Sequence, residues 1–203
     1  FEYKYQYLES GVKLVSRHAI EDKGTFDFNS NVNSCLWTDV RIQDRVIRVY
    51  CAHLQSNRVS SSATELIEKG DLTEKNTWLG VRSMLGRYKV ASKIRDEQSN
   101  RIKTHASGCE HPVLICGDLN DHPLSHPVHQ LACNYQDSFK EKGFGWGTTY
   151  GGSIPMLRID YILADSAFRV INHSIEPNDY SDHYFVHAGL EIKDKEDVMD
   201  RSD

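Results

Sequence analysis

The chain has 203 residues, of which 39% are hydrophobic, and this is enough for one sizeable core in a single domain. Its formal net charge of −5 argues against a strongly basic clamp that binds nucleic acid by neutralising phosphates. No apolar run approaches the roughly 20 residues that a membrane-spanning helix requires, and no signal peptide is visible. The first residue is Phe1 rather than methionine, so we expect the chain to begin inside a longer protein.

The cysteines exclude two further classes. They number five, and no two have C-x-x-C spacing, which fits neither a disulfide framework nor a zinc site. Cys35, Cys51 and Cys116 lie in apolar runs and are predicted to be buried free thiols. This use of cysteine favours a reducing, cytoplasmic compartment.

The first quarter of the chain has the alternating pattern of β-strands. Strands are predicted over residues 11–17, 35–41 and 46–54, and Gln43-Asp44 is the expected hairpin turn between the last two. The third strand contains His53 at its end. We therefore expect the imidazole of His53 to stand at the C-terminal edge of a sheet.

The next segment is polar and then helical. A loop is predicted over residues 56–64, followed by a short helix over 63–69 that ends at Gly70. Apolar residues then recur at helical spacing over residues 76–104, either as one helix or as two with a break near Gly86. We interpret the Lys and Arg residues of this stretch as a solvated face rather than a helix dedicated to nucleic acid.

A short stretch in the middle of the chain has the clearest signal of chemistry. The apolar run before Gly117 predicts a buried strand, and Asp118, Asn120 and Asp121 follow it at the strand's C-terminal edge. Carboxylate and amide oxygens suit hard cations, and a carboxylate can also act as a base on water. The same residues are common turn formers, so a simple turn is the alternative. A calcium loop is excluded, because the required Gly and terminal Glu are absent.

The last third of the chain predicts more strands. A loop and a short helix are expected over residues 123–131, and strands over 157–163, 168–175 and 184–192. Together these elements predict one domain over residues 1–192. The charged residues 193–203 are expected to form a disordered tail.

Glycines alternate with aromatic residues between positions 143 and 152. This stretch contains Phe144, Trp146 and Tyr150 but lacks the G-K-[ST] ending of a phosphate-binding loop. A flexible aromatic loop beside a site would stack on a base or a ring. A surface turn with packed aromatics fits the pattern equally well.

Two acidic residues in the last third have special neighbours. Asp160 lies inside the predicted strand 157–163, where a buried carboxylate is costly unless a histidine or arginine pairs with it. Asp182 and His183 place a hard-cation ligand beside a titratable imidazole. Taken singly, each is more often structural than functional.

Four short motifs occur in a definite order along the chain. They are His53-Leu54, Gly117-Asp118-x-Asn120, Arg158-Ile159-Asp160-Tyr161 and Ser181-Asp182-His183. In this order they resemble the endonuclease/exonuclease/phosphatase superfamily, whose members include DNase-like nucleases, sphingomyelinases and inositol-polyphosphate phosphatases. The resemblance implies an α+β fold: a four-layer sandwich with two mainly antiparallel sheets face to face and helices outside.

The resemblance also implies roles for the matched residues. Asp118 would be the general base that activates the attacking water, and Asn120 would orient this water or contact the phosphate. Asp160 would pair with His183, and His183 would bind the scissile phosphate. His53 would contact the phosphate or assist the leaving group. The chain would then be a metal-dependent phosphoesterase acting on a nucleic acid, a phospholipid headgroup or an inositol phosphate.

The expected metal is Mg²⁺ or Mn²⁺, with Asp182 as a ligand. The family has an Asn and a metal-binding Glu on two strands that precede everything matched here, and Glu2, Glu9 and Glu21 do not stand in the matching context. We therefore expect the chain to be a fragment or a truncated form that lacks this Glu ligand. A catalytically inactive binding module with the same fold is the alternative function.

Overall fold

A computed structural model describes residues 3–6, 12–30, 32–57, 75–152, 154 and 156–194. Its strands are β1 (Tyr3–Gln6), β2 (Lys13–Ser16), β3 (Ala19–Asp27), β4 (Ser34–Ile42), β5 (Arg45–His53), β6 (Val113–Asp118), β7 (Gln136–Asp137), β8 (Asp160–Ala164), β9 (Phe168–Glu176) and β10 (Phe185–Ile192). Its helices are α2 (Lys75–Ser107), α3 (His126–Ala132) and α4 (Ser138–Lys142). The helix predicted over 63–69 and the tail residues 195–203 lie outside the described residues.

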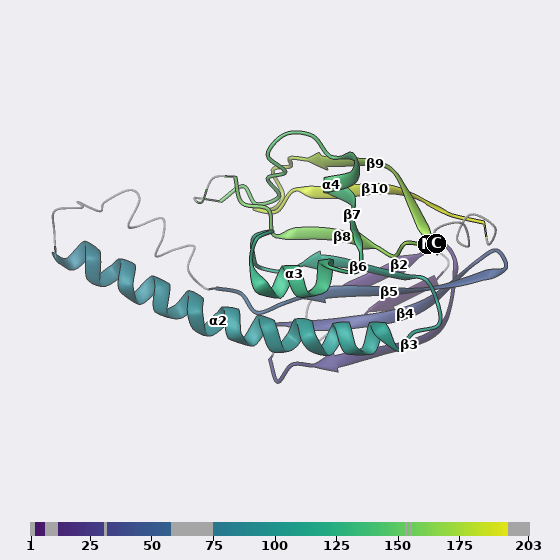
Figure 1. Cartoon of the computed structure of the whole chain (residues 1–203), viewed down its shortest axis with the longest axis horizontal. Coiled ribbons are helices and arrows are strands. Elements are labelled where there is room, and N and C mark those ends of the chain that lie inside the picture. The colour runs from purple at the N-terminus through teal and green to yellow at the C-terminus, as the bar shows by residue number, and fades with distance from the viewer. Residues whose placement is uncertain are drawn as a thin grey trace, which may run out of the picture.

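The centre of the molecule is a six-stranded sheet with the strand order β3-β4-β5-β6-β8-β7 (Figure 1). Strands β5 and β6 are parallel, and the other neighbours in this sheet are antiparallel. The parallel pair requires a long return connection, which includes α2. Strands β9 and β10 form a separate antiparallel pair, as do β1 and β2.

The two faces of the central sheet pack against different layers. Alternate residues such as Tyr50 and Ile115 belong to a core shared with Ile102 of α2 and with α3, which lie on one face of the sheet. On the opposite face, Ile47 joins Phe168 of β9 in a second core, against which β10 packs. This arrangement confirms the predicted α+β sandwich of two sheets with helices outside.

Most of the predicted strands occur close to their expected bounds, including the hairpin of β4 and β5 around Gln43-Asp44. Gln43 adopts the left-handed backbone conformation (φ 55°) that a tight hairpin turn uses. The segment over 76–104 is a single helix, because Gly86 lies in an open position and does not interrupt α2. Among the described residues, no helix is long and apolar enough to cross a membrane.

Two expectations about the strands need correction. Asp160 is the first residue of β8 rather than an interior one, since Leu157 instead bridges to Tyr150 and precedes the strand. Strand β3 was not predicted, because Gly24 and four charged residues obscure its alternation. Gly24 is nevertheless needed there, since a Cβ at this position would lie 2.6 Å from the ring of Trp37.

Candidate active site

Three of the predicted site residues lie in one row across the central sheet. Asp118 at the end of β6 pairs in register with His53 at the end of β5 on one side and with Asp160 at the start of β8 on the other. Residues in register on neighbouring strands present their side chains to the same face. The sheet topology therefore brings together groups that are 107 positions apart in the sequence, from His53 to Asp160.

A glycine permits the close approach of β5 and β6 just before this row. Gly117 has a φ of 131°, which disfavours residues with a side chain, and a Cβ on it would lie only 2.1 Å from the carbonyl oxygen of Ala52. The glycine of the Gly117-Asp118-x-Asn120 motif is thus explained by local packing.

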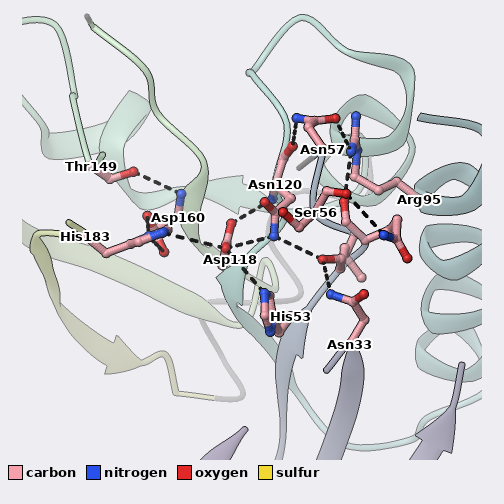
Figure 2. Close-up of polar contacts among 12 residues, drawn as sticks. Asn33, His53, Ser56, Asn57, Arg95, Asp118, Asn120, Thr149, Asp160 and His183 are labelled. Atoms are coloured by element: carbon pink, nitrogen blue, oxygen red, sulfur yellow. Dashed lines mark hydrogen bonds and ion pairs between the residues drawn. The ribbon is translucent and has the colours of Figure 1, made fainter. Parts of the chain in front are cut away.

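Asp118 is held by Asn120 through two hydrogen bonds (Figure 2). The backbone N–H of Asn120 donates to Asp118 Oδ1 and its side-chain Nδ2 donates to Asp118 Oδ2, each at 2.8 Å. Asn120 has a φ of 54°, a left-handed conformation that Asn tolerates well, and its Nδ2 also donates to the carbonyl of Leu54 at 3.0 Å. Asn120 therefore holds the carboxylate of Asp118 against the ends of both β5 and β6.

His183 lies over the row and contacts both carboxylates (Figure 2). Its Nδ1 is 3.0 Å and 3.2 Å from the two oxygens of Asp160, so this nitrogen must carry the donated proton. Its Nε2 lies 4.0 Å from Asp118 Oδ2, and His53 Nε2 lies 3.7 Å from the same oxygen. Asp118 thus stands between two imidazoles.

The surroundings shift the pKa values of these three groups apart. Burial, reinforced by the nearby charge of Asp160, raises the pKa of Asp118 to about 7. The hydrogen bond from His183 to Asp160 raises the pKa of His183 to about 9, whereas burial and the proximity of His183 lower the pKa of His53. At neutral pH the site therefore has a protonated His183, a neutral His53 and a carboxylate close to its titration midpoint.

Thr149 holds the start of β8 beside the site. Its hydroxyl, which is fully buried, accepts hydrogen bonds from the backbone N–H groups of Ile159 and Asp160 at 3.0 Å and 3.1 Å. These contacts fix where β8 begins and so where the carboxylate of Asp160 stands. Thr149 was not predicted as a site residue, since no local pattern distinguishes it from other threonines in a loop.

A buried network holds the segments that follow β5 and β6. Arg95 of α2 pairs with Asp121 at 2.8 Å and donates to the carbonyl of Gln55 and to Asn57 Oδ1. Asn57 Nδ2 in turn donates to the backbone carbonyl of Asn120 at 3.2 Å. Asp121, one of the three residues for which a simple turn was the alternative, is a buried ion-pair partner whose role follows from this long-range contact.

Asp182, the expected metal ligand, is exposed beside the site. Its backbone carbonyl accepts a hydrogen bond from the N–H of Gly151 at 2.7 Å. Within the described part of the chain, no group of three or more His, Cys, Asp or Glu side chains converges in a way that would hold a metal ion. The described residues thus do not by themselves complete the donor set of a metal centre.

The glycine and aromatic stretch over 143–152 divides into two parts. Tyr150 lies against the site, with its ring 5.3 Å from that of His183 in an edge-on arrangement. Phe144 and Trp146 are exposed to solvent. The two interpretations of this stretch, an aromatic loop beside a site and a surface turn, therefore apply to different residues. Tyr150 adjoins the candidate site, and the other two aromatics lie at the surface.

The protein is an α+β sandwich, and a carboxylate with a pair of imidazoles lies at the strand ends of its central sheet. This is the architecture of DNase-like proteins. The family model of the Endonuclease/Exonuclease/phosphatase family matches residues 2–183, and the chain belongs to this family. Its members are hydrolases that act on phosphate esters and generally use divalent metal ions. Comparison with curated proteins gave no significant match.

Solved structures support the same fold. An endonuclease/exonuclease/phosphatase family protein from Bacteroides thetaiotaomicron is 16% identical, with a TM-score of 0.60 over 88% of this chain and 65% of that one. The human Nocturnin catalytic domain, with a bound sulfate anion, is 14% identical, with a TM-score of 0.58 over 87% of this chain and 61% of that one. A mannosyl-6-phosphatase from Bacteroides thetaiotaomicron is 15% identical, with a TM-score of 0.53 over 86% of this chain and 67% of that one. The chain thus spans about two thirds or less of these proteins.

Proposed function

We propose that the protein hydrolyses phosphate esters with a water molecule that Asp118 activates as a general base. The observation that carries this proposal is the row of His53, Asp118 and Asp160 with His183 above it. A base works best when its pKa lies near the working pH, and the pKa of Asp118 is raised to about 7. Asn120, which binds both oxygens of this carboxylate, would orient the base toward the water.

The two imidazoles suit different tasks in this reaction. His183, protonated at neutral pH, would bind the scissile phosphate and stabilise the negative charge that grows as water attacks phosphorus. Asp160 would keep this imidazole oriented, because it accepts the proton on Nδ1. His53, neutral at the same pH, would contact the phosphate or assist departure of the leaving oxygen.

The proposed site suits several phosphate-ester substrates and a divalent metal ion. A phosphodiester or a phosphomonoester in a nucleic acid, a phospholipid headgroup or an inositol phosphate would suit the site. Because the family generally uses divalent metals, we propose Mg²⁺ or Mn²⁺ as the ion, with Asp182 among its ligands. Oxygen donors such as this carboxylate are those that Mg²⁺ prefers.

The test is hydrolysis by the chain with Mg²⁺ or Mn²⁺, measured on DNA, RNA, inositol phosphates, sphingomyelin and bis-p-nitrophenyl phosphate. The Asp118→Asn variant retains the shape of the side chain but removes the base. We expect its kcat to fall by about 10²–10⁴ on whichever substrate the wild type cleaves. Asp44→Asn, in the hairpin turn at the far end of the sheet, is the matched control and should keep full activity.

Equal turnover by the Asp118→Asn variant and the wild type would refute the proposed base. The alternative of a binding module predicts a different pattern. The wild type would then cleave none of the substrates with either metal, and calorimetry would still detect binding of a phosphate ester that His183→Ala abolishes.

A further inference from the structure

The first half of α2 extends beyond the body of the protein. A helix of 33 residues is about 50 Å long, whereas the six residues of β6 span only about 20 Å. Figure 1 shows the early turns of α2 reaching past the end of the sheet where β5 and β6 end, which is the end with the candidate active site. Buried residues recur along α2 only from Ala91 onward, and none of residues 78–90 is buried.

This projecting part carries apolar and basic side chains on one stripe. Trp78, Arg82, Leu85 and Lys89 follow one another at spacings of four, three and four residues, so they lie along one side of the helix. Trp78 and Leu85 are 59% and 58% exposed. The face that packs on the body is a different one, marked by Ala91 and Arg95.

The charge of this part is opposite to that of the whole chain. From residue 78 to residue 90 the sequence contains three basic residues, Arg82, Arg87 and Lys89, and no Asp or Glu, whereas the chain as a whole has a net charge of −5. A helix with basic side chains and exposed Trp and Leu has the composition that lies in the headgroup region of anionic membranes.

Other exposed apolar side chains gather at the same end of the molecule. Leu124 follows the end of β6 and is 91% exposed, while Tyr180 precedes His183 and is 94% exposed. Met156 and Phe185, in segments next to β8 and His183, are also exposed. By contrast, the described turns at the opposite end, around residues 43–44, 108–112 and 165–167, expose no large apolar side chain.

We propose that this end of the molecule docks on an anionic lipid surface through the first half of α2 and the apolar rim around the site. The exposed aliphatic residues favour a membrane over nucleic acid, because Leu side chains partition into lipid whereas bases stack on aromatic rings. Docking in this orientation turns the mouth of the site toward the lipid headgroups. A phosphate ester carried by a lipid would then reach Asp118, and this consequence rests on the proposed function. The docking itself does not depend on the proposed function.

Sedimentation of the chain with vesicles tests the docking without any need for hydrolysis. Vesicles of phosphatidylcholine are compared with vesicles of phosphatidylcholine and phosphatidylserine at low and high salt. We expect the wild type to bind the mixed vesicles at least about tenfold more tightly, and added salt to weaken this binding, because the attraction is screened. No binding to either vesicle, or equal binding to both, overturns the proposal.

Paired variants locate the surface. Arg82→Glu with Lys89→Glu should weaken binding to the mixed vesicles by at least about tenfold, whereas Lys140→Glu with Lys142→Glu, the same change of charge on α4, should leave it unchanged. Leu85→Gln with Leu124→Gln should also weaken binding, and Val15→Gln with Ile171→Gln, exposed away from the site, should not. Circular dichroism checks that each variant is folded.

Two results contradict the assignment. Equal loss of vesicle binding in the α2 and α4 charge variants would place the contact elsewhere. Binding of a short single-stranded nucleic acid that depends on Arg82 and Lys89, in the absence of vesicle binding, would assign the surface to the other class of partner. Turnover of soluble bis-p-nitrophenyl phosphate, measured in parallel, reports on the proposed function separately, since a variant that no longer docks should still cleave this substrate.

Discussion

Asp118 has an ordinary carboxyl group in an unusual place. It is largely buried, it faces Asp160 across the sheet, and these two influences outweigh the hydrogen bonds from Asn120 that favour its charged form. Burial and the charge of Asp160 destabilise the ionised carboxylate in the folded state. The same two influences raise its affinity for a proton, which is useful to a general base. The pKa of Asp118 is therefore sensitive to any charge placed beside its carboxyl group.

The activity should depend on pH through the ionisation of Asp118. Because the base must be deprotonated, kcat/KM should rise with pH through about 7, the pKa of Asp118. Asn120→Asp replaces the donor to Asp118 Oδ2 with a second carboxylate and should move this rise to higher pH. The measurement is a pH profile of hydrolysis of bis-p-nitrophenyl phosphate.

Asn57→Asp is the control for that profile. It introduces the same charge one step farther from the base, and the new carboxylate faces the guanidinium of Arg95. The pH at which kcat/KM rises in Asn57→Asp should stay close to that of the wild type. A profile for Asn120→Asp that coincides with the wild-type profile would mean that Asp118 is not the titrating base.

The second prediction concerns stability and the pair of His183 and Asp160. The pKa of His183 is raised in the folded state to about 9 from an ordinary value near 6.5, so the folded protein holds this proton more tightly than the unfolded chain. The resulting stabilisation, about 2 kcal/mol, is fully present below pH 6.5 and is lost as the pH rises through 9.

Urea unfolding of the wild type and of Asp160→Asn between pH 7 and pH 9.5 measures this loss. Asp118, with a pKa of about 7, also titrates at the lower end of this window, so the change above about pH 8 is the part that reports on the histidine. The wild type should lose its advantage over the variant as the pH rises. A difference that stays constant across the window would show that the pair contributes no pH-dependent stability.

The sequence was most informative about residues at strand ends. The positions of His53, Asp118 and Asn120 follow from apolar runs that stop just before or at them, and the structure places them in contact or in register. What these residues do chemically stays a prediction. Asp121 and Thr149 were not interpretable in the same way, because their partners are Arg95 and the backbone of β8, which only folding brings near.

At the scale of the elements, the join between β5 and β6 depends on the absence of a side chain at Gly117. Gly117→Ala would place a methyl group 2.1 Å from the carbonyl oxygen of Ala52 and would force alanine into a φ of 131°. Overpacking and backbone strain of this kind cost about 1–3 kcal/mol each, so we expect the free energy of unfolding to fall by at least about 2 kcal/mol. Denaturant titration monitored by circular dichroism measures the change.

Gly86→Ala is the matched control within α2. A Cβ at Gly86 meets nothing within 4 Å, so alanine should leave stability unchanged or raise it by up to about 1 kcal/mol through its better helix propensity. If the two variants proved equally stable, the close approach of β5 and β6 would not be what requires a glycine in the motif.

Elements with a strong periodic pattern were predictable, and those fixed by distant contacts were not. The hairpin of β4 and β5 and the long helix α2 follow from local spacing and turn chemistry. Strands β3 and β7 and helix α4 lack such a signal. The two residues of β7 pair with β8, and Arg158 just before β8 forms a buried ion pair with Asp137 of β7 at 2.7 Å, a contact between segments far apart in the sequence.

At the scale of the whole molecule, Arg95 joins the helical layer to the edge of the sheet that has the site. Its guanidinium is fully buried and contacts Asp121, Gln55 and Asn57, which belong to the segments after β6 and β5. A buried carboxylate that loses its cation is far more costly than an exposed one, because water cannot replace the missing partner. This single residue thus couples the stability of the fold to the geometry of the site.

Arg95→Met keeps the apolar stem and removes the charge, so Asp121 would stay buried without its cation. We expect the free energy of unfolding to fall by about 3–5 kcal/mol in urea titration, and hydrolysis to fall in the fraction that remains folded. Arg41→Met breaks an exposed pair with Glu21, which water can replace, and should cost far less. Arg95→Met combined with Asp121→Asn should recover part of the loss, since the unpaired charge is then absent. A loss for Arg95→Met as small as that for Arg41→Met would mean that the helix and the site edge are held together by their apolar contacts alone.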